Sequence, residues 1–442
     1  MSTALETSAP SAQHDDSYPV TTTGPDLNTH PEYFRARQQA AWDTFTQMRM
    51  PIRTDETWRF ADVKALGLDA YARGAAVSDS QQAELLAKSK GLAETSGHMV
   101  FANDTLLARH FHGEALRAKG VLWLPLEQAI AEQRELIERH FMRDEAILGS
   151  QKFAALHASQ VRAGMFLYVP KGVEIALPVE TFHWLCGENA SVFPHTLIIA
   201  EDHAKVTVVD HFASASAAPG LAIGVNDMSV GPGARVTYVA VQDWNRATTA
   251  FHINSTVVHR DGSAMALRLN LGGEMVRDEA VSRLRGQGGR SDMLSVSAAV
   301  GEQVFDQRTL QIHEQPNTAS DLLYKNALND TTHTIFTGLI RVDDGAHKTD
   351  AYQKVRNLLL SEEAEANSAP GLEIEADDVR CTHGATSGAL EGEELFYLES
   401  RGIPRRMAQQ LITFGFLSEV FERLPDKALR ELLTEKLHGK LG

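Results

Sequence analysis

One short pattern returns at a fixed interval along the middle of the chain and restricts the folds that are open to it. The copies are DHAKVTVVD, PGARVTYVA, GSAMALRLN and, more weakly, DMLSVSAAV, which begin at residues 202, 232, 262 and 292. They align Ala204, Ala234 and Ala264 at spacings of 30 residues. Self-similarity with a period between about 20 and 50 residues is typical of stacked repeats.

Each copy contains one segment in which apolar residues alternate with other residues. Val206 and Val208 in the first copy, and Val236 and Tyr238 in the second, share one face of an extended strand. A unit of this size is too short to bury a core alone, whereas stacked units bury a continuous one. The sequence therefore predicts a mainly β fold, a parallel β-helix, with a closed sandwich with longer loops as the alternative.

Helical patterns come before the repeats. From Pro31 onward, Phe34, Ala41 and Phe45 recur at helical spacings. A second helix is expected over LEQAIAEQRELIERHF, residues 126–141, and short strands are expected at HMVFAND and VLWLPL. The apolar face of the second helix consists of Leu126, Ala129, Ile130, Ile137 and Phe141.

A helical pattern also closes the chain. The helix expected from Pro404 to Leu424 carries two apolar stripes, which are more than one packing face buries. Pro425 ends this helix, and Asp426 is the expected N-cap of a closing helix that buries Leu429, Leu432, Leu433 and Leu437. Either the two helices pack on their own domain, or part of them is a docking surface for another protein. The candidate docking residues are Met407, Leu411, Phe414, Phe416 and Val420.

These patterns divide the chain into four parts. Residues 1–29, rich in Ser, Thr and Pro, are expected to form a disordered tail. Residues 30–160 form an N-terminal helical region, residues 161–390 the parallel β-helix, and residues 391–442 a C-terminal helical domain.

Composition narrows the possible functions. The net charge of −16 disfavours non-specific binding to nucleic acid or to an anionic membrane. Two cysteines, Cys186 and Cys381, exclude a disulfide framework and a four-thiolate metal site within one chain. The sequence contains no GxxxxGK[ST] motif, no secretory leader, and no apolar run near the roughly 18 residues of a membrane span. We expect a cytoplasmic protein that does not bind ATP through a P-loop.

Cys381 and His383 stand two residues apart near the end of the β-rich region. In a strand, both side chains point to one face, about 6.6 Å apart along the backbone. A nucleophile and its base need about 3 Å between heteroatoms, which disfavours cysteine-hydrolase chemistry. The pair suits a thiophilic metal, but two ligands leave a site half built. The simpler alternative is a buried thiol beside a hydrogen-bonded histidine.

The region from Leu323 to Pro404 resembles the SufB/SufD family of iron-sulfur cluster assembly proteins. It contains the family motifs F-x-G-x-I-x-V, K-T-D-A-x-Q, N-L-L-L-S, P-x-L-E-I and C-x-H-G-A-T. The segment DETWRFADV, residues 55–63, resembles the N-terminal Trp-Arg-aromatic motif of the family. CTHGATSG is closer to the SufD branch than to the SufB branch. His347 and Gly371 depart from the usual residues at their positions.

The resemblance implies a right-handed parallel β-helix flanked by N-terminal and C-terminal helical domains, and a non-catalytic scaffold rather than an enzyme. Such a chain pairs with a SufB paralogue through the β-helix and carries a SufC ATPase on its C-terminal helices. His383 matches the metal-ligating histidine of the cluster interface, with Cys381 beside it. No cofactor is expected to bind stably, because the iron-sulfur cluster is transient and shared with the partner.

Three other functions stay open from the sequence. A SufB-like paralogue could act as a homodimer. A β-helix also houses polysaccharide lyases and hydrolases, whose sites place Asp, Lys and Arg on an outer face. A metal-dependent hydrolase would use Cys381, His383 and further histidines.

Overall fold

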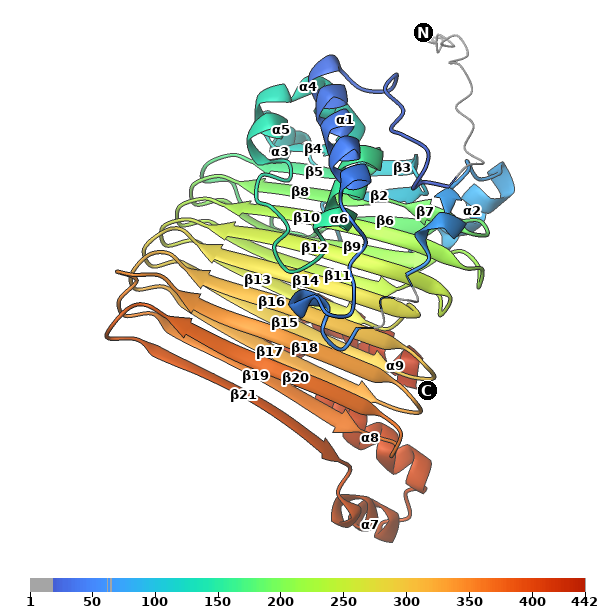
Figure 1. Cartoon of the computed structure of the whole chain (residues 1–442), viewed down its shortest axis with the longest axis vertical. Helices are drawn as coiled ribbons and strands as arrows, with labels where there is room; N and C mark the ends of the chain where they lie inside the picture. The colour runs from blue at the N-terminus through green and yellow to red at the C-terminus, as the bar shows by residue number, and fades with distance from the viewer. Residues whose placement is uncertain (1–18, 62, 64–65, 442) are drawn as a thin grey trace.

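Two long sheets wound as one β-helix make up most of the computed structural model, which describes residues 19–61, 63 and 66–441 (Figure 1). Successive strands of the coils enter the two sheets in turn, and neighbouring strands within the coils are parallel. Helices lie at both ends of the chain. The prediction of a mainly β fold, a parallel β-helix flanked by helical regions, is confirmed.

We call the two sheets sheet A and sheet B. Sheet A has the order β20 (Glu365–Ile374), β18 (His333–Val342), β16 (Val304–His313), β14 (Met275–Leu284), β12 (Thr248–Val258), β10 (Gly220–Val230), β8 (His195–Ala200), β5 (Gly164–Val169) and β4 (Leu122–Pro125), and β7 (Ala190–Val192) joins β10 to β1 (Ala72–Arg73). Sheet B has the order β21 (Arg380–Ala389), β19 (Asp350–Leu359), β17 (Ala319–Leu328), β15 (Arg290–Ala299), β13 (Ser263–Asn270), β11 (Arg235–Asp243), β9 (Lys205–Ser214), β6 (Val179–Leu185), β2 (Gly97–Ala102) and β3 (Thr105–Phe111).

The coils differ in length. Val206 of β9 pairs with Val236 of β11, 30 residues later, but Val236 pairs with Ala264 of β13, 28 residues later. The predicted alignment of Ala234 with Ala264 was therefore wrong by two residues. The reason is that the chain passes from sheet B to sheet A in fewer residues in the second of these coils.

Each coil also has a second strand, in sheet A, that the sequence pattern did not reveal. In β10, with the sequence GLAIGVNDMSV, ten of the eleven residues are buried, because one face meets the interior of the β-helix and the other lies under N-terminal segments. A strand buried on both faces has no polar and apolar alternation.

Three apolar layers hold the molecule together. The interior of the β-helix contains the predicted inward residues, including Val208 and Tyr238. On the outer face of sheet A, Phe153 stacks on Phe251 with ring centroids 3.9 Å apart. The outer face of sheet B is covered by C-terminal helices in a cluster that includes Leu417.

The N-terminal region has short helices, which are α1 (Glu32–Gln47), η1 (Glu56–Trp58), η3 (Leu68–Ala70), α2 (Asp79–Lys88), α3 (Glu114–Ala118), α4 (Leu126–Glu132), α5 (Arg134–His140) and α6 (Gln151–Gln160). The single helix expected over residues 126–141 is two helices, because Gln133 has non-helical angles, φ −119° and ψ 46°. The five apolar residues predicted for its face are nevertheless all buried.

The predicted disordered tail does not extend through residues 19–29. Val20 is buried, Pro19 forms a bridge with Ala72, and Asp26 pairs with Arg162 at 3.0 Å. Residues 1–18 lie outside the described residues, so the rest of this prediction is untested.

The C-terminal helices are α7 (Gly392–Ser400), α8 (Arg405–Ser418), η4 (Phe421–Arg423) and α9 (Lys427–Leu441). The helix expected to reach Leu424 ends at Ser418. Asp426 caps the closing helix as predicted, because its carboxylate accepts the backbone N–H of Leu429 at 3.1 Å. In the described part of the chain, we find no helix with the length and apolar character needed to cross a membrane.

Candidate functional site in the last coil of the β-helix

The last coil of the β-helix is left open. β20 and β21 are the end strands of their sheets, and within the described residues no strand pairs with their outer edges. Figure 1 shows α7 following the end of β21 without covering the strand along its length. As a result, the apolar side chains of Leu372 and Ile374 are 36% and 41% exposed. This end presents both free backbone groups and apolar surface.

Cys381 lies on β21 beside Ala351 of β19, which is fully buried. Its side chain is half-buried and packs against a small apolar cluster that includes Val342 and Ala376. Burial raises the pKa of the thiol, and the nearby carboxylate of Asp350 raises it further. The thiol is therefore protonated at neutral pH, which is the state of a packing residue rather than of an activated nucleophile.

His383 lies on the same strand, beside Gln353 of β19. His383 is exposed, and its ring forms no hydrogen bond within the described part of the chain. Gln353 is buried, and neither its Oε1 nor its Nε2 has a hydrogen-bond partner. The inner side of this end thus combines an exposed imidazole and a half-buried thiol of the last coil with a buried amide of the preceding coil, whose polar atoms are unpaired.

Within the described residues, no three side chains among His, Cys, Asp and Glu come together so as to hold a metal ion. Cys381 and His383 therefore offer at most two ligands at this end of the chain. Any metal held there would need further ligands from elsewhere.

The last coil is also strongly acidic. The segment between residues 361 and 389 contains seven exposed carboxylates and one arginine, Arg380. The carboxylates are Glu362, Glu363, Glu365, Glu373, Glu375, Asp377 and Asp378. The local charge is thus −6, a large share of the net charge of −16 of the whole chain.

The candidate docking residues of the C-terminal helices separate into two groups. Met407 and Leu411 of α8 are 52% and 48% exposed, and Phe396 and Tyr397 of the neighbouring helix α7 are 71% and 58% exposed. We call these four residues the α7–α8 surface. The sequence stripes missed its α7 half, because Phe396 and Tyr397 are adjacent and follow no helical period.

The other candidates face the body of the protein. The Phe414 ring stacks on His438 with centroids 3.9 Å apart. The Phe416 ring lies 4.6 Å from the Lys325 Nζ and 5.6 Å from the Arg356 guanidinium. Val420 is fully buried against sheet B, so the prediction that it contacts a partner was wrong: its side chain is not at the surface.

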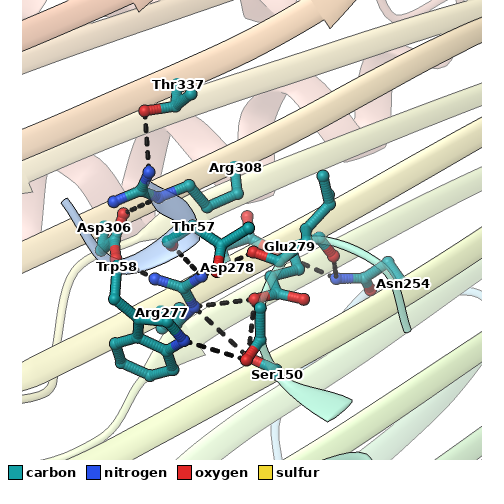
Figure 2. A network of polar contacts seen from close by, with 12 residues as sticks. Thr57, Trp58, Ser150, Asn254, Arg277, Asp278, Glu279, Asp306, Arg308 and Thr337 are labelled. Carbon is teal, nitrogen blue, oxygen red and sulfur yellow. Dashed lines mark hydrogen bonds and ion pairs between the residues drawn. The ribbon is translucent and has the colours of Figure 1, made fainter. Parts of the chain in front are cut away.

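A buried polar network on the outer face of sheet A was not predicted (Figure 2). The Arg277 guanidinium pairs with Glu279 at 2.7 Å and with Asp306 of the next strand. The Arg308 Nε donates to the other Asp306 oxygen at 2.5 Å. The Ser150 hydroxyl donates to Glu279 at 2.6 Å, so these buried charges have partners.

This network fixes the Trp-Arg-aromatic segment to the β-helix. The Arg277 guanidinium lies 3.9 Å from the Trp58 ring centroid and donates to the carbonyl oxygens of Thr57 at 2.8 Å and Leu148 at 2.7 Å. The Trp58 indole N–H donates to the Gly149 carbonyl at 2.9 Å. Arg277 and Asp306 are register partners on adjacent strands, so opposite charges one coil apart were the signal that could have revealed the network.

Comparisons with known proteins agree with this architecture. Residues 183–416 match the model for the SufBD core domain of SUF system FeS cluster assembly, and residues 27–181 match the SufBD protein N-terminal region. The iron-sulfur cluster assembly protein SufD of Bacillus subtilis is 33% identical over 74% of this chain and 76% of its own length. SufD of Escherichia coli K12 is 29% identical over 89% of both chains.

The fold and these matches define a β-helix protein of the class that serves iron-sulfur cluster assembly. The chain belongs to the SufBD family of the SUF system.

Proposed function

We propose that this chain is a non-catalytic scaffold subunit of the SUF system. It pairs with a SufB paralogue through the open end of its β-helix, and it carries a SufC-type ATPase on the α7–α8 surface. The observation that supports this proposal best is the last coil, where two unpaired strand edges coincide with His383 and Cys381.

Pairing through the open end would satisfy the backbone hydrogen-bonding groups at the free edges of β20 and β21. Free edges present rows of N–H and C=O groups that accept another strand. A second β-helix placed end to end would add strands to both sheets by β-augmentation. The same contact would cover the exposed apolar side chains of Leu372 and Ile374.

Charge favours a paralogue over a second copy of this chain. Two identical ends would bring together two coils that each carry a charge of −6. Like-charge juxtaposition across an interface costs several kcal/mol, so it acts against a homodimer. A partner whose last coil is basic would turn the same charges into attraction.

The cluster and its iron and sulfide are cargo in this proposal. His383 is exposed at the proposed interface, where a neutral imidazole nitrogen is a suitable ligand for iron. The partner supplies the remaining ligands, so the cluster forms on the complex and is released from it. ATP hydrolysis in the SufC-type subunit would shift the conformation of the complex, because its two nucleotide states bind the scaffold differently.

Co-expression with SufB-type and SufC-type partners tests the scaffold role. We expect the three chains to co-purify and to accumulate a cluster on anaerobic addition of iron and sulfide. A chain that purifies free of both partners under these conditions would contradict the proposal.

The ATPase contact is tested separately with Leu411→Asp. A carboxylate within the α7–α8 surface would cost on the order of 2 kcal/mol or more on docking. We expect loss of the ATPase with retention of the SufB-type partner in pull-downs. Glu435→Ala, a change at an exposed position of α9 outside this surface, is the control and should keep both partners. Retention of the ATPase by Leu411→Asp would refute this assignment.

A further inference from the structure

A pocket of about 150 Å³ lies far from the open end, where α5 and the loop after it cross sheet A. Its polar lining includes His140 and Arg143 from this crossing segment, Ser229 from β10, Ser255 from β12, and His259 and Arg285 from the turns that follow the strands. Strands β14, β16 and β18 separate β12 from the end strand β20. The pocket is thus distinct from the last coil and from the α7–α8 surface.

The pocket holds polar groups that are free to bind a ligand. Within the described residues, the side chains of His140, Arg143, Ser229, Ser255 and His259 form no hydrogen bond or ion pair with the protein. They come from three separate segments, yet they line one cavity. A guanidinium, two imidazoles and two hydroxyls form a set rich in hydrogen-bond donors.

The carboxylates in the pocket already have partners. Asp144 accepts from the Arg285 Nη2 at 2.6 Å and also lies 3.6 Å from the Arg283 Nε. Asp227 accepts the backbone N–H of Met142 at 2.6 Å and lies 3.4 Å from the His195 Nε2. Among the described residues, no carboxylate forms an ion pair with the exposed Arg143 guanidinium.

Arginines lie near both imidazoles of the pocket. Burial lowers the pKa of His140 to about 4, and the nearby Arg139, Arg143 and His259 lower it further. The carboxylate of Asp227 raises this pKa. Burial also lowers the pKa of His259. Arg285 and Arg143 lower it further, whereas Glu201 raises it. The lining carries two arginines and two aspartates, so an anion would depend on Arg143, the arginine of the lining that forms no ion pair with a carboxylate among the described residues.

We propose that this pocket is a binding site for a small oxyanion, of the phosphate or compact carboxylate class. The Arg143 guanidinium would hold its charge, and one ring N–H of each of His140 and His259 and the Ser229 and Ser255 hydroxyls would donate to its oxygens. The cavity is smaller than the roughly 300–1,000 Å³ of pockets for drug-sized ligands, which fits a ligand of this size.

Such a ligand would join two layers of the protein. Arg143 belongs to the loop that continues to Gly149 and Ser150, which take part in the network of Figure 2. The serines belong to sheet A. Binding would therefore stabilise the N-terminal layer on the β-helix. This inference does not depend on the proposed scaffold role.

Calorimetric titration of the full chain with inorganic phosphate, citrate or sulfate tests the site, with sodium chloride at matched ionic strength as the reference. We expect saturable binding of at least one oxyanion with a dissociation constant below about 1 mM. A response to phosphate alone or to citrate alone would identify which source of oxyanion the site prefers. Weak, non-saturating heats with all three anions would overturn the proposal.

Two variants and a matched control assign the binding to the pocket. Arg143→Ala and His259→Asn should each weaken binding at least about tenfold, since charge-assisted hydrogen bonds are the strong ones in such a site. Arg260→Ala changes a neighbouring exposed arginine that does not line the pocket and should bind as the wild type does. Equal affinity in all three variants would show adventitious binding elsewhere and would also overturn the proposal. Unchanged melting temperatures without ligand would confirm that the variants fold.

Discussion

The two ends of the β-helix differ. At the N-terminal end, β3 and β4 close the two sheets and run antiparallel to β2 and β5. At the other end, no further strand lies beside β20 or β21 among the described residues. Helices add to the closed end, where the rings of Phe34 and Phe141 pack in an apolar cluster. At the open end the corresponding surface is exposed and acidic.

The difference indicates what each end is for. Stacked repeats need a terminal cap to remain soluble, and the N-terminal end has one. An uncapped end with free strand edges is a liability unless another chain covers it. The carboxylates at the open end oppose random edge-to-edge association while leaving a basic partner free to bind. We therefore interpret the open end as an interface whose charge selects the partner.

Of the single changes at the open end, we expect His383→Ala to have the largest effect, which is a loss of cluster formation. The cluster bound to the reconstituted complex should fall more than about tenfold, because even outer partners of a metal site are worth about 10–100-fold. The exposed side chain should leave the fold intact. Iron and sulfide content after anaerobic reconstitution is the measurement.

Thr382→Ala is the matched control for His383→Ala. Thr382 is the exposed neighbour that points to the opposite face of the same strand, so its loss should leave the cluster content unchanged. A His383→Ala complex that accumulates a normal amount of cluster would remove His383 from the site.

Reversing charge at the open end should change the choice of partner. With Glu373→Lys and Glu375→Lys combined, the charge of the last coil rises from −6 to −2. We expect pairing with the SufB-type partner to weaken by about tenfold or more, and self-association of the isolated chain to increase, because the like-charge repulsion falls. Sedimentation equilibrium measures both effects. If pairing is unaffected at low salt, charge does not select the partner.

The β-helix could be predicted from the sequence because one strand of each coil has a buried inner face and a more polar outer face. The second strand of each coil could not be predicted, because both of its faces are buried, as in β10.

The turns between the strands indicate the repeat more regularly than the strands do. One turn of each coil contains a residue with positive φ, and these residues are His203, Gly233, Asp261, Gly288, Asn317, Lys348 and Asp378. Most of them are Gly, Asn or Asp, the residues that best tolerate this conformation.

The candidate site was only partly predictable. The Cys-x-His spacing indicated two ligands on one face of a strand, but whether that strand was an inner or an end strand depends on where α7 goes after Ala389. No local pattern in Gly392–Ser400 determines this path. The same limit applied to Val420, since an apolar stripe does not show whether sheet B or a partner covers it.

Carboxylates behave differently inside the coils near the closed end. Burial raises the pKa of Asp210 to about 6, although Thr196 and Tyr238 donate to it at 2.5 and 2.9 Å. Because the folded pKa exceeds the reference value of 3.8, this group favours folding at low pH, and its contribution is lost as the pH rises through about 6.

Asp210→Asn should therefore stabilise the chain at pH 8 relative to the wild type, by up to about 3 kcal/mol, and less at pH 4. Denaturant unfolding at the two pH values measures the difference. An effect that is the same at both values would show that Asp210 does not titrate in this range.

Packing at the two ends can be compared with a pair of glycines. A Cβ on Gly97 of β2 would lie 2.5 Å from the buried Trp123 ring, whereas a Cβ on Gly384 of β21 meets nothing within 4 Å. Gly97→Ala should cost about 1–3 kcal/mol through overpacking. Gly384→Ala should stay within about 0.5 kcal/mol of the wild type. Equal unfolding free energies for the two variants would contradict the conclusion that side chains pack more closely at the closed end than at the open end.

The smallest effect is expected from Cys381→Ser. The thiol is half-buried and, like Val379, packs against the apolar cluster that includes Val342 and Ala376, and its raised pKa keeps it protonated. To ligate iron it would have to lose its proton and leave this packing. A serine hydroxyl nearly preserves the volume and should cost less than about 1 kcal/mol of stability. We expect the cluster content of the complex to stay close to that of the wild type, well above that of His383→Ala. If the two variants lose cluster equally, Cys381 is itself a ligand, and the open end provides two ligands rather than one.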